Sequence, residues 1–445
     1  MESWKGLTDG PVAPVEPQFE EILRLTLPEP ARVPVGLKDL LAATPSDLPM
    51  TVNERVLRYV NYFLGRGRKS LQASHGRAGA YRAMISRVLA EQRVPQDLIY
   101  LVQAESGFRP QVKSSKKATG MWQFVAWRGR EYGLSQNRQV DERMDPEKAT
   151  YAAAQHLADL HAQFGDWYLA MAAYNCGPGC VQRAVERTGY ADYWELAARG
   201  ALPRETANFV PAILALALLG KNAEAVQLDQ VVPEEPIEYG TVRIASAMSI
   251  DLIADATAST AEHIRRLNPA LLGPVTPSGP YSLRIPANTG DRFEREIAVV
   301  PEAHRRTWRR YEVGPGETLA RIAARYRVTP LQIAAVNRLG PEGPGAGDRL
   351  TIPVAGRSSA VASTGVRRYR VRAGDTLGEL ARRYRVSVSQ LQRWNGITGT
   401  RLETGQVLTI RAQPGSSPRP RAVAGGGPAK DTPAGLAAGS GPEGS

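Results

Sequence analysis

The spacing of hydrophobic residues divides this chain into two regions. From Val52 to about Lys221, apolar positions recur with helical spacing and are interrupted by short breaks of glycine, proline and aspartate. The most apolar run, VPAILALALLG at 210–220, is too short to cross a membrane and predicts a buried core helix. After residue 225, short alternating segments are separated by turns. We therefore predict a mainly α-helical domain followed by small α+β modules.

An internal repeat defines the second region. The sequence YEVGPGETLARIAARY, which starts at Tyr311, returns as YRVRAGDTLGELARRY at Tyr369 with its glycine, threonine and leucine positions in register. Each copy predicts a strand, a tight glycine turn, two helices and a closing strand, which is a βααβ unit. Residues 242–286 form a third, degraded copy that lacks the Gly-x-Thr turn.

Composition and repeats together predict the domain boundaries. The first 50 residues are rich in proline and weakly periodic, and the last stretch consists mostly of glycine, alanine, proline and serine. We expect an extended N-terminal segment (1–50), a helical domain (51–225), a spacer formed by the degraded copy (226–307), two complete modules (308–355 and 366–412) and a disordered tail (413–445).

One glutamate in the helical domain is unusually placed. In DLIYLVQAESGFRP (97–110), Pro95 suits a first helical turn and Gly107 is placed to end the helix. Glu105 shares a face with core-directed residues such as Leu98. A carboxyl group on an apolar face is costly unless it is paired or protonated, and a raised pKa suits a general acid. A salt-bridged glutamate at a helix end is the alternative that this helix alone leaves open.

The net charge of +12 restricts the class of partner. Arginine supplies nearly all of it, and apart from a short group at 305–310 the arginines are dispersed. No nucleic-acid-binding signature is present, so we expect no nucleic-acid partner. We interpret the charge as attraction to a polyanionic surface, such as a cell wall that carries free carboxylates.

The two cysteines and the histidines bear on redox state and metals. Cys176 and Cys180, in NCGPGC, could pair as a local disulfide in an oxidising compartment or stay free at a turn. None of the five histidines is spaced to complete a metal site, so we expect no metal and no cofactor. The N-terminal sequence shows neither a signal peptide nor a lipid-accepting cysteine.

The residues downstream of the glutamate carry a family resemblance. ESGFRP at 105–110 is followed by Ser114 and Gln123, and later by AYN at 173–175. In this order and spacing they strongly resemble the lytic transglycosylase domain of the goose-type-lysozyme-like class. With the two terminal repeats, the chain resembles the membrane-bound lytic murein transglycosylase D family over roughly residues 51–412. The resemblance implies a mainly α lysozyme-like catalytic domain.

The resemblance also implies a reaction in which Glu105 is the lone acid and base. It would protonate the oxygen between N-acetylmuramic acid and N-acetylglucosamine, and the muramoyl acetamido group would stabilise the cationic centre. The same sugar's 6-hydroxyl would then close a 1,6-anhydro ring without water. Glycosidases usually need two carboxylates, but Asp141 and Asp145 are better explained as turn and helix-cap residues.

The resemblance further implies a set of substrate-binding residues. These are Ser114, Gln123, Tyr174, Asn175, Trp122 and Phe209. Ser114 would lie near the acetamido group, and Tyr174 would orient the glutamate. Trp122 would form an apolar wall, with core packing as an equal alternative. Phe209 stands where the family usually has tyrosine, so one hydroxyl near the cleft is lost.

The two complete modules resemble LysM domains, a βααβ family that binds chains containing N-acetylglucosamine. Their first loops carry Gly316 and Thr318 in one module and Gly374, Asp375 and Thr376 in the other. We interpret these turn residues as mostly structural and the whole module as the binding unit. Tandem linkage strengthens weak single contacts.

The leading hypothesis is a monomeric lytic transglycosylase that acts on peptidoglycan glycan strands in the periplasm or cell envelope. That location requires an export signal that this N-terminus does not show, so we infer a processed form or a missed upstream start. Peripheral or lipid-anchored membrane association is compatible with it but is not encoded here. A muramidase-type hydrolase of the same fold and a non-catalytic peptidoglycan-binding protein remain alternatives. The intact set of Glu105, Ser114, Gln123, Tyr174 and Asn175 argues against a non-catalytic protein.

Overall fold

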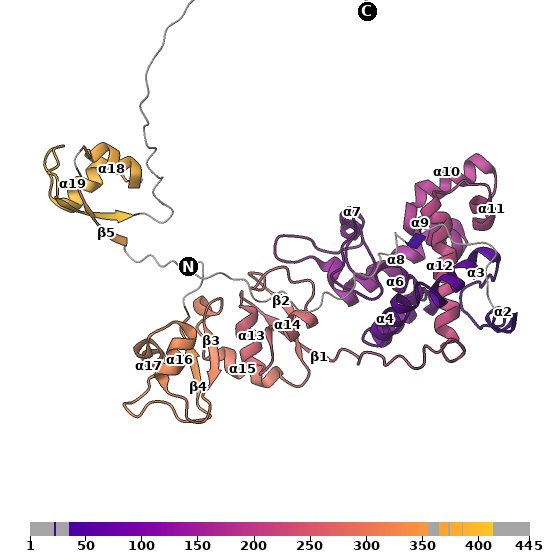
Figure 1. Ribbon diagram of the computed structural model, residues 1–445, viewed down its shortest axis with the longest axis horizontal. Helices are drawn as coiled ribbons and strands as arrows, with labels where there is room; N and C mark the ends of the chain where they lie inside the picture. Colours follow the sequence, from indigo (N-terminus) through magenta and orange to yellow (C-terminus); the bar gives the residue numbers. More distant parts are fainter. Residues whose placement is uncertain (1–21, 24–34, 355–364, 373, 385, 413–445) are drawn as a thin grey trace, which may run out of the picture. The chain divides into compact units, whose positions relative to one another are not determined.

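The computed structural model divides the chain into two compact units, residues 1–354 and 355–445 (Figure 1). The described residues are 22–23, 35–354, 365–372, 374–384 and 386–412. The tail at 413–445, for which we expected disorder, lies outside the described residues.

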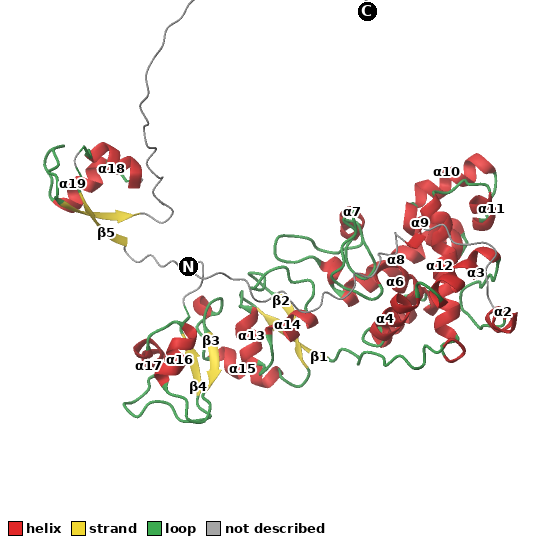
Figure 2. Cartoon of the chain, viewed as in Figure 1, coloured by secondary structure: helices red, strands yellow, loops and turns green. Residues whose placement is uncertain are grey.

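The first part of the first unit is helical (Figure 2). Its helices are α2 (Val35–Ala42), α3 (Glu54–Leu64), α4 (Arg68–Ala78), α5 (Arg82–Glu91), η1 (Gln96–Leu98), α6 (Ile99–Ser106), α7 (Ala126–Glu131), η2 (Glu142–Met144), α8 (Pro146–Phe164), α9 (Trp167–Cys176), α10 (Pro178–Thr188), α11 (Tyr193–Ala198), α12 (Arg204–Lys221) and η3 (Glu224–Val226). Helix α12 packs against α3, α6 and α9 and lies at the centre of the core.

The central position of α12 follows from its composition. Every residue from Phe209 to Leu219 is buried, because the helix is apolar on all sides and other helices surround it. This confirms the prediction of a core helix for the run at 210–220. Among the residues that the structure describes, no helix has both the length and the hydropathy of a membrane span.

Local signals place the start of α8 and the end of α6 where the sequence predicts them. Gly107 ends α6 in the left-handed conformation, with φ 57°. Asp145 caps α8 by accepting hydrogen bonds from the backbone nitrogens of Glu147 and Lys148, and Pro146 takes the first helical position. Both predictions are confirmed, and Glu105 therefore lies in the last turn of α6.

The described part of the segment before residue 50 is less extended than we predicted. It contains α2, whose Leu41 is buried in the core. Leu23 is also buried, and its carbonyl accepts a hydrogen bond from the Asn208 side chain at 2.9 Å. In the described residues of this segment, apolar side chains that the weak periodicity did not reveal pack onto the helical domain.

The degraded copy folds as a βααβ unit with an added helix. Its elements are β1 (Tyr239–Ile244), α13 (Ile250–Ala256), α14 (Ala261–Leu267), β2 (Tyr281–Pro286), α15 (Gly290–Ala298) and η4 (Glu302–His304). Strands β1 and β2 are antiparallel, with Val242 opposite Leu283. The unit has its own core, which includes Ile253, Ile264 and Phe293.

The two complete copies have the predicted order of elements. The first contains β3 (Arg309–Glu312), α16 (Leu319–Tyr326), α17 (Pro330–Asn337) and β4 (Arg349–Ile352), and the second contains β5 (Gly365–Arg370), α18 (Leu377–Tyr384), α19 (Val388–Asn395) and β6 (Val407–Ala412). In each copy the two strands pair antiparallel.

One asparagine explains why all three copies share a repeat position. The side chain of Asn337 donates to the carbonyls of Ile333 and Thr351 and accepts from the Thr351 backbone nitrogen, so it ties the second helix to the closing strand. Asn268 and Asn395 make the same set of bonds in the other two copies. The repeated asparagine is therefore a structural residue.

The first complete copy is held to the degraded copy by ion pairs. Arg309 binds Asp255 at 2.5 and 2.7 Å, and the buried Arg310 binds the buried Glu296 at 2.7 Å. Part of the basic group at 305–310 is therefore used inside the protein and does not form an open polyanion-binding surface.

Candidate active site

Two adjoining hollows lie in the helical domain, with volumes of about 60 and 300 Å³. They share a wall formed by Glu105, Gln123, Asn175 and Glu205. We call the two hollows together the cleft. Glu105 reaches this wall from the last turn of α6 and is partly buried. The glutamate that the sequence singled out is thus accessible from two sides.

A tightly held loop brings Ser114 and Gln123 to the cleft. Gln123 has a left-handed backbone, φ 49°, and its side-chain amide donates to the carbonyls of Gly120 at 2.7 Å and Val112 at 3.3 Å. The Ser114 hydroxyl accepts from the Ala118 backbone nitrogen at 3.2 Å and lines the first hollow. In this structure the Gln123 amide nitrogen is used to shape the loop.

Arg143 fixes the same loop from behind. It is buried, binds Asp141 through two nitrogens, and donates to the carbonyls of Lys117 and Phe124. A side chain at Gly120 would meet the Arg143 carbonyl at 1.8 Å, which only glycine avoids. Asp141, which we predicted as a turn residue, caps η2 and is engaged by this arginine.

Helix α9 supplies Tyr174 and Asn175. The Tyr174 hydroxyl donates to the Trp122 carbonyl at 2.7 Å. Burial, and to a smaller extent the charge of Glu105, raises the pKa of Tyr174 well above its usual value, so the phenol stays neutral. Asn175 accepts a hydrogen bond from the Thr206 hydroxyl at 2.7 Å, which ties α9 to α12 beside the cleft.

The two predicted aromatic contacts differ in placement. Phe209 is 1% exposed and lines the first hollow. Trp122 is 0% exposed, lines neither hollow, and donates its indole N–H to the Thr150 hydroxyl at 2.9 Å. The sequence left core packing open for Trp122, and the structure places it in the core.

Sequence reasoning missed two residues of the cleft. Trp127 is 58% exposed, lines the second hollow, and stacks with the Arg128 guanidinium 4.3 Å from its ring centre. Glu205 is a second carboxylate in the shared wall and forms an ion pair with Lys116 at 3.1 Å. The sequence offered no signal for Trp127, because this residue lies outside the motif that contains Trp122.

A disulfide joins Cys176 and Cys180, whose Cα atoms are 5.9 Å apart. It links the end of α9 to the start of α10, directly after Asn175, and Cys176 lines the second hollow. The structure thus selects one of the two thiol states that the sequence left open.

The predicted loop residues of the repeats occupy turns. Gly316 and Gly374 have φ values of 71° and 86°, which favour glycine. The hydroxyls of Thr318 and Thr376 accept hydrogen bonds from the first turns of α16 and α18. Asp375 accepts from the Tyr369 hydroxyl at 2.7 Å and from the Arg372 backbone nitrogen at 2.8 Å. These contacts give each residue a structural role.

Beside this turn, the second unit has a hollow of about 430 Å³ that Arg372 and Gly405 help to line. Within the described part of the chain, no three histidine, cysteine or acidic side chains gather as a metal site would need.

Family models match four stretches of the chain. The transglycosylase SLT domain matches residues 83–197, and the LysM domain matches 311–353 and 369–411. The degraded copy matches the LysM-like domain of lytic transglycosylase MltD over 238–298. We call residues 238–298 the LysM-like domain and the complete copies the LysM modules. The fold is a helical, lysozyme-like SLT domain followed by βααβ LysM modules.

One relative matches most of the chain, and other proteins match parts of it. Membrane-bound lytic murein transglycosylase D of Escherichia coli (strain K12) is 30% identical over 391 residues, which cover 84% of this chain and 85% of the relative. The cell wall-binding protein YocH of Bacillus subtilis (strain 168) is 30% identical over 101 residues, 23% of this chain and 33% of that protein. The 70 kDa soluble lytic transglycosylase of Escherichia coli is similar over 36% of this chain and 29% of its own, with 21% identity and a TM-score of 0.29.

The SLT domain with its LysM modules defines an enzyme of the lytic transglycosylase class that acts on peptidoglycan. The chain belongs to the membrane-bound lytic murein transglycosylase D family.

Proposed function

We propose that the cleft cleaves the β-1,4 bond between N-acetylmuramic acid and N-acetylglucosamine and leaves 1,6-anhydromuramoyl ends, with Glu105 as the acid and base. The supporting observation is that Glu105 lies in the wall shared by the two hollows. An acid that protonates a bridging oxygen needs sugar on both sides of it. Two hollows that meet at one carboxyl group provide that arrangement.

The neighbours of Glu105 have roles that suit this reaction. Tyr174 is a neutral, buried phenol whose hydroxyl is fixed on the Trp122 carbonyl, so its ring forms a rigid wall near the glutamate. Ser114 and Asn175 line the first hollow and present polar atoms to the substrate. Trp127 offers an exposed aromatic face in the second hollow, on which a sugar ring can stack.

Hydrolysis is the second candidate, and Glu205 is the observation that favours it. A hydrolase needs a base to activate water, and Glu205 is a second carboxylate in the cleft wall. Its carboxylate is engaged in an ion pair with Lys116 at 3.1 Å. We favour ring closure by the substrate's own hydroxyl, because that reaction needs Glu105 alone.

The LysM modules at 308–355 and 366–412 would bind peptidoglycan glycan strands and hold the enzyme on its polymer. The family relationship indicates the cell envelope, and we propose the periplasmic side, a monomeric state and no nucleic-acid partner. The proposed reaction uses Glu105 and groups of the substrate, so it requires no cofactor.

The test pairs Glu105→Gln with Glu224→Gln, a matched change at an exposed glutamate outside the cleft. Purified insoluble peptidoglycan is incubated with each protein, and both released fragments and protein sedimented with the wall are measured. We expect Glu105→Gln to release nothing while it sediments like the unaltered protein, and Glu224→Gln to match the unaltered protein in both. Substantial release by Glu105→Gln would contradict the assignment of Glu105.

A further inference from the structure

A larger pocket, of about 980 Å³, lies where the helical domain meets the LysM-like domain. One wall is the stretch 108–112, which follows α6, together with Arg77 and Tyr81. The opposite wall comes from α14 and its flanking residues, 260–269. We call it the seam pocket. Its volume lies within the range of sites that bind small organic ligands.

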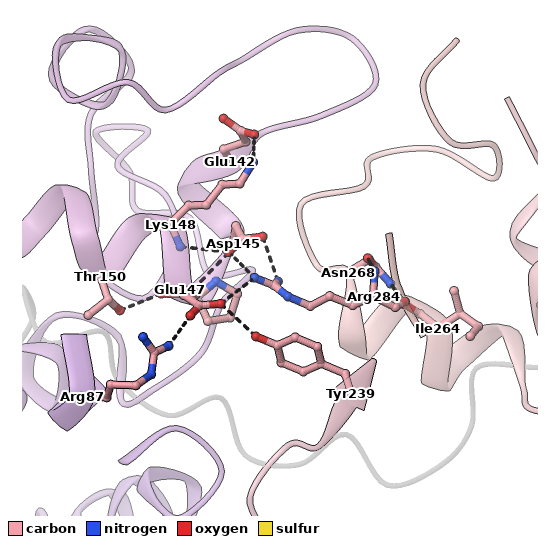
Figure 3. A network of polar contacts seen from close by, with 11 residues as sticks. Arg87, Glu142, Asp145, Glu147, Lys148, Thr150, Tyr239, Ile264, Asn268 and Arg284 are labelled. Atoms are coloured by element: carbon pink, nitrogen blue, oxygen red, sulfur yellow. Dashed lines mark hydrogen bonds and ion pairs between the residues drawn. The ribbon is translucent and has the colours of Figure 1, made fainter. Parts of the chain in front are cut away.

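The two walls are held in register by contacts between the domains. The Gln111 side chain donates to the Pro269 carbonyl at 3.2 Å, and the Asp141 backbone nitrogen donates to the Ala270 carbonyl at 3.0 Å. Figure 3 shows a third link, in which Arg284 binds Asp145. These contacts fix the positions of the two domains whose surfaces form the seam pocket.

A polar network extends this link around Glu147, in the first turn of α8 (Figure 3). Its carboxylate accepts from the Tyr239 hydroxyl of β1 at 2.8 Å and also pairs with Arg87 of α5 and with Arg284. Residues from three elements thus converge on one carboxylate. The LysM-like domain is fixed to the helical domain by side chains as well as by backbone bonds.

The walls of the seam pocket carry an excess of positive charge. The lining contains four arginines and two glutamates, which give a net charge of +2 with His263 counted as neutral. They are Arg77, Arg109, Arg265, Arg266, Glu234 and Glu262. Arg266 pairs with Glu234 at 3.5 Å, and Arg265 is exposed at the wall. Guanidinium groups bind carboxylates through parallel hydrogen bonds. The pocket therefore suits a ligand with carboxylate groups.

The seam pocket adjoins the cleft. Arg109 and Val112 line both the seam pocket and the first hollow, and Arg109 follows Glu105 by four residues. The nitrogen Nε of Arg109 donates to the Ser106 carbonyl at 2.8 Å, which fixes this side chain at the boundary. Arg109 and Val112 therefore form a boundary that the cleft and the seam pocket share.

We propose that the seam pocket binds the peptide stem of peptidoglycan. The stem is attached to the lactyl group of the muramoyl residue and carries free carboxylates, so it has the required charge and branches from the sugar that the cleft must hold. The LysM-like domain then supplies one wall of a substrate-binding site. This inference rests on the proposed function, because it requires a muramoyl sugar bound in the cleft beside Glu105.

The test uses Arg265→Glu, with Arg295→Glu as the matched control at an exposed arginine of the same domain, on α15 and outside the pocket. Both are assayed on peptide-bearing glycan strands and on strands from which an amidase has removed the peptides. We expect Arg265→Glu to lower kcat/KM about tenfold on peptide-bearing strands, as for the loss of one charge-assisted contact. The loss should appear in KM, and stripped strands and the control should be unaffected.

A binding measurement separates this inference from the proposed function. Calorimetry with the free stem peptide, without any sugar, requires no turnover. We expect the unaltered protein and Arg295→Glu to bind the peptide and Arg265→Glu to bind it about tenfold more weakly. Equal peptide affinity in Arg265→Glu, or an equal loss of kcat/KM on both kinds of strand, would overturn the proposal. An absence of turnover with intact peptide binding would instead count against the proposed function alone.

Discussion

Arg284 of the LysM-like domain donates to both carboxylate oxygens of Asp145, the cap of α8, at 2.8 and 2.9 Å. The two side chains are 14% and 11% exposed. The same carboxylate accepts the backbone nitrogens of Glu147 and Lys148. One group therefore both starts a helix of the SLT domain and docks the next domain.

Loss of Arg284 should destabilise the first unit. Arg284→Ala leaves Asp145 largely buried without its ionic partner, at a cost of about 3 kcal/mol in the free energy of unfolding. Urea unfolding of the full chain, followed by tryptophan fluorescence, measures it. Arg295→Ala, on the same domain but exposed, should change the midpoint little. Equal midpoints for the two variants would show that the pair contributes nothing.

Tyr174→Phe should impair both stability and turnover. It removes the donor to the Trp122 carbonyl, and an unmade buried hydrogen bond costs about 1–2 kcal/mol. The lost bond also fixes the ring that lines the second hollow with Glu105. We therefore expect kcat to fall about tenfold, which corresponds to about 1.4 kcal/mol of transition-state stabilisation. Unfolding curves and release assays measure the two effects. Tyr190→Phe, at an exposed tyrosine, is the control, and unchanged kcat in Tyr174→Phe would contradict the orienting role.

His156 should make the helical domain sensitive to acid. The Tyr132 hydroxyl donates to Asp159, so the Nδ1–H of a neutral His156 donates to the Tyr132 oxygen at 3.0 Å. Burial, reinforced by Arg128, lowers the pKa of His156 to about 3. The unfolded imidazole titrates near 6.5, so between these values the unfolded state binds the extra proton. The contribution of neutral His156 to the free energy of unfolding is therefore complete above pH 6.5 and is lost as the pH falls toward 3.

Unfolding in urea at pH 7 and pH 5 tests whether stability falls with pH as expected. The unaltered protein should lose about 2 kcal/mol over that interval through His156, at about 1.4 kcal/mol per pH unit below 6.5. His156→Gln should lower stability at pH 7 but remove that part of the pH dependence. His263→Gln, at an exposed histidine, should leave the dependence as it is. The same acid sensitivity in His156→Gln would show that other groups cause it.

The disulfide should stabilise the end of α9. Replacing Cys176 and Cys180 by serine opens a loop of a few residues, for which the chain-entropy estimate is about 2 kcal/mol. We expect a lower urea midpoint and weaker turnover, because Asn175 precedes the bridge. Thiol titration of the denatured, unreduced protein should find no free thiol. Two titratable thiols in native, active enzyme would contradict the structure.

Local signals made much of this fold predictable. The glycine at 107, the Asp-Pro pair at 145–146 and the βααβ repeat each depend on neighbours within a few positions, and the structure confirms them. The core helix α12 followed from composition alone.

The rest depends on long-range packing. Arg284 and Asp145 are 139 residues apart in sequence, so nothing local reports their pairing. Trp122 and Trp127 differ by five positions, yet one is in the core and the other is exposed in the cleft. Glu205 reaches the wall of Glu105 from the first turn of α12, where a helix-start glutamate has an ordinary explanation.

The mass of the products tests the central claim most directly. Glycan strands are digested to completion by the unaltered enzyme and by Glu205→Gln, and the new muramoyl ends are weighed. With Glu105 as the lone acid and base, both enzymes should leave 1,6-anhydro ends, lighter by one water than reducing ends. Reducing ends from the unaltered enzyme, lost in Glu205→Gln, would show that Glu205 activates water and would contradict this account.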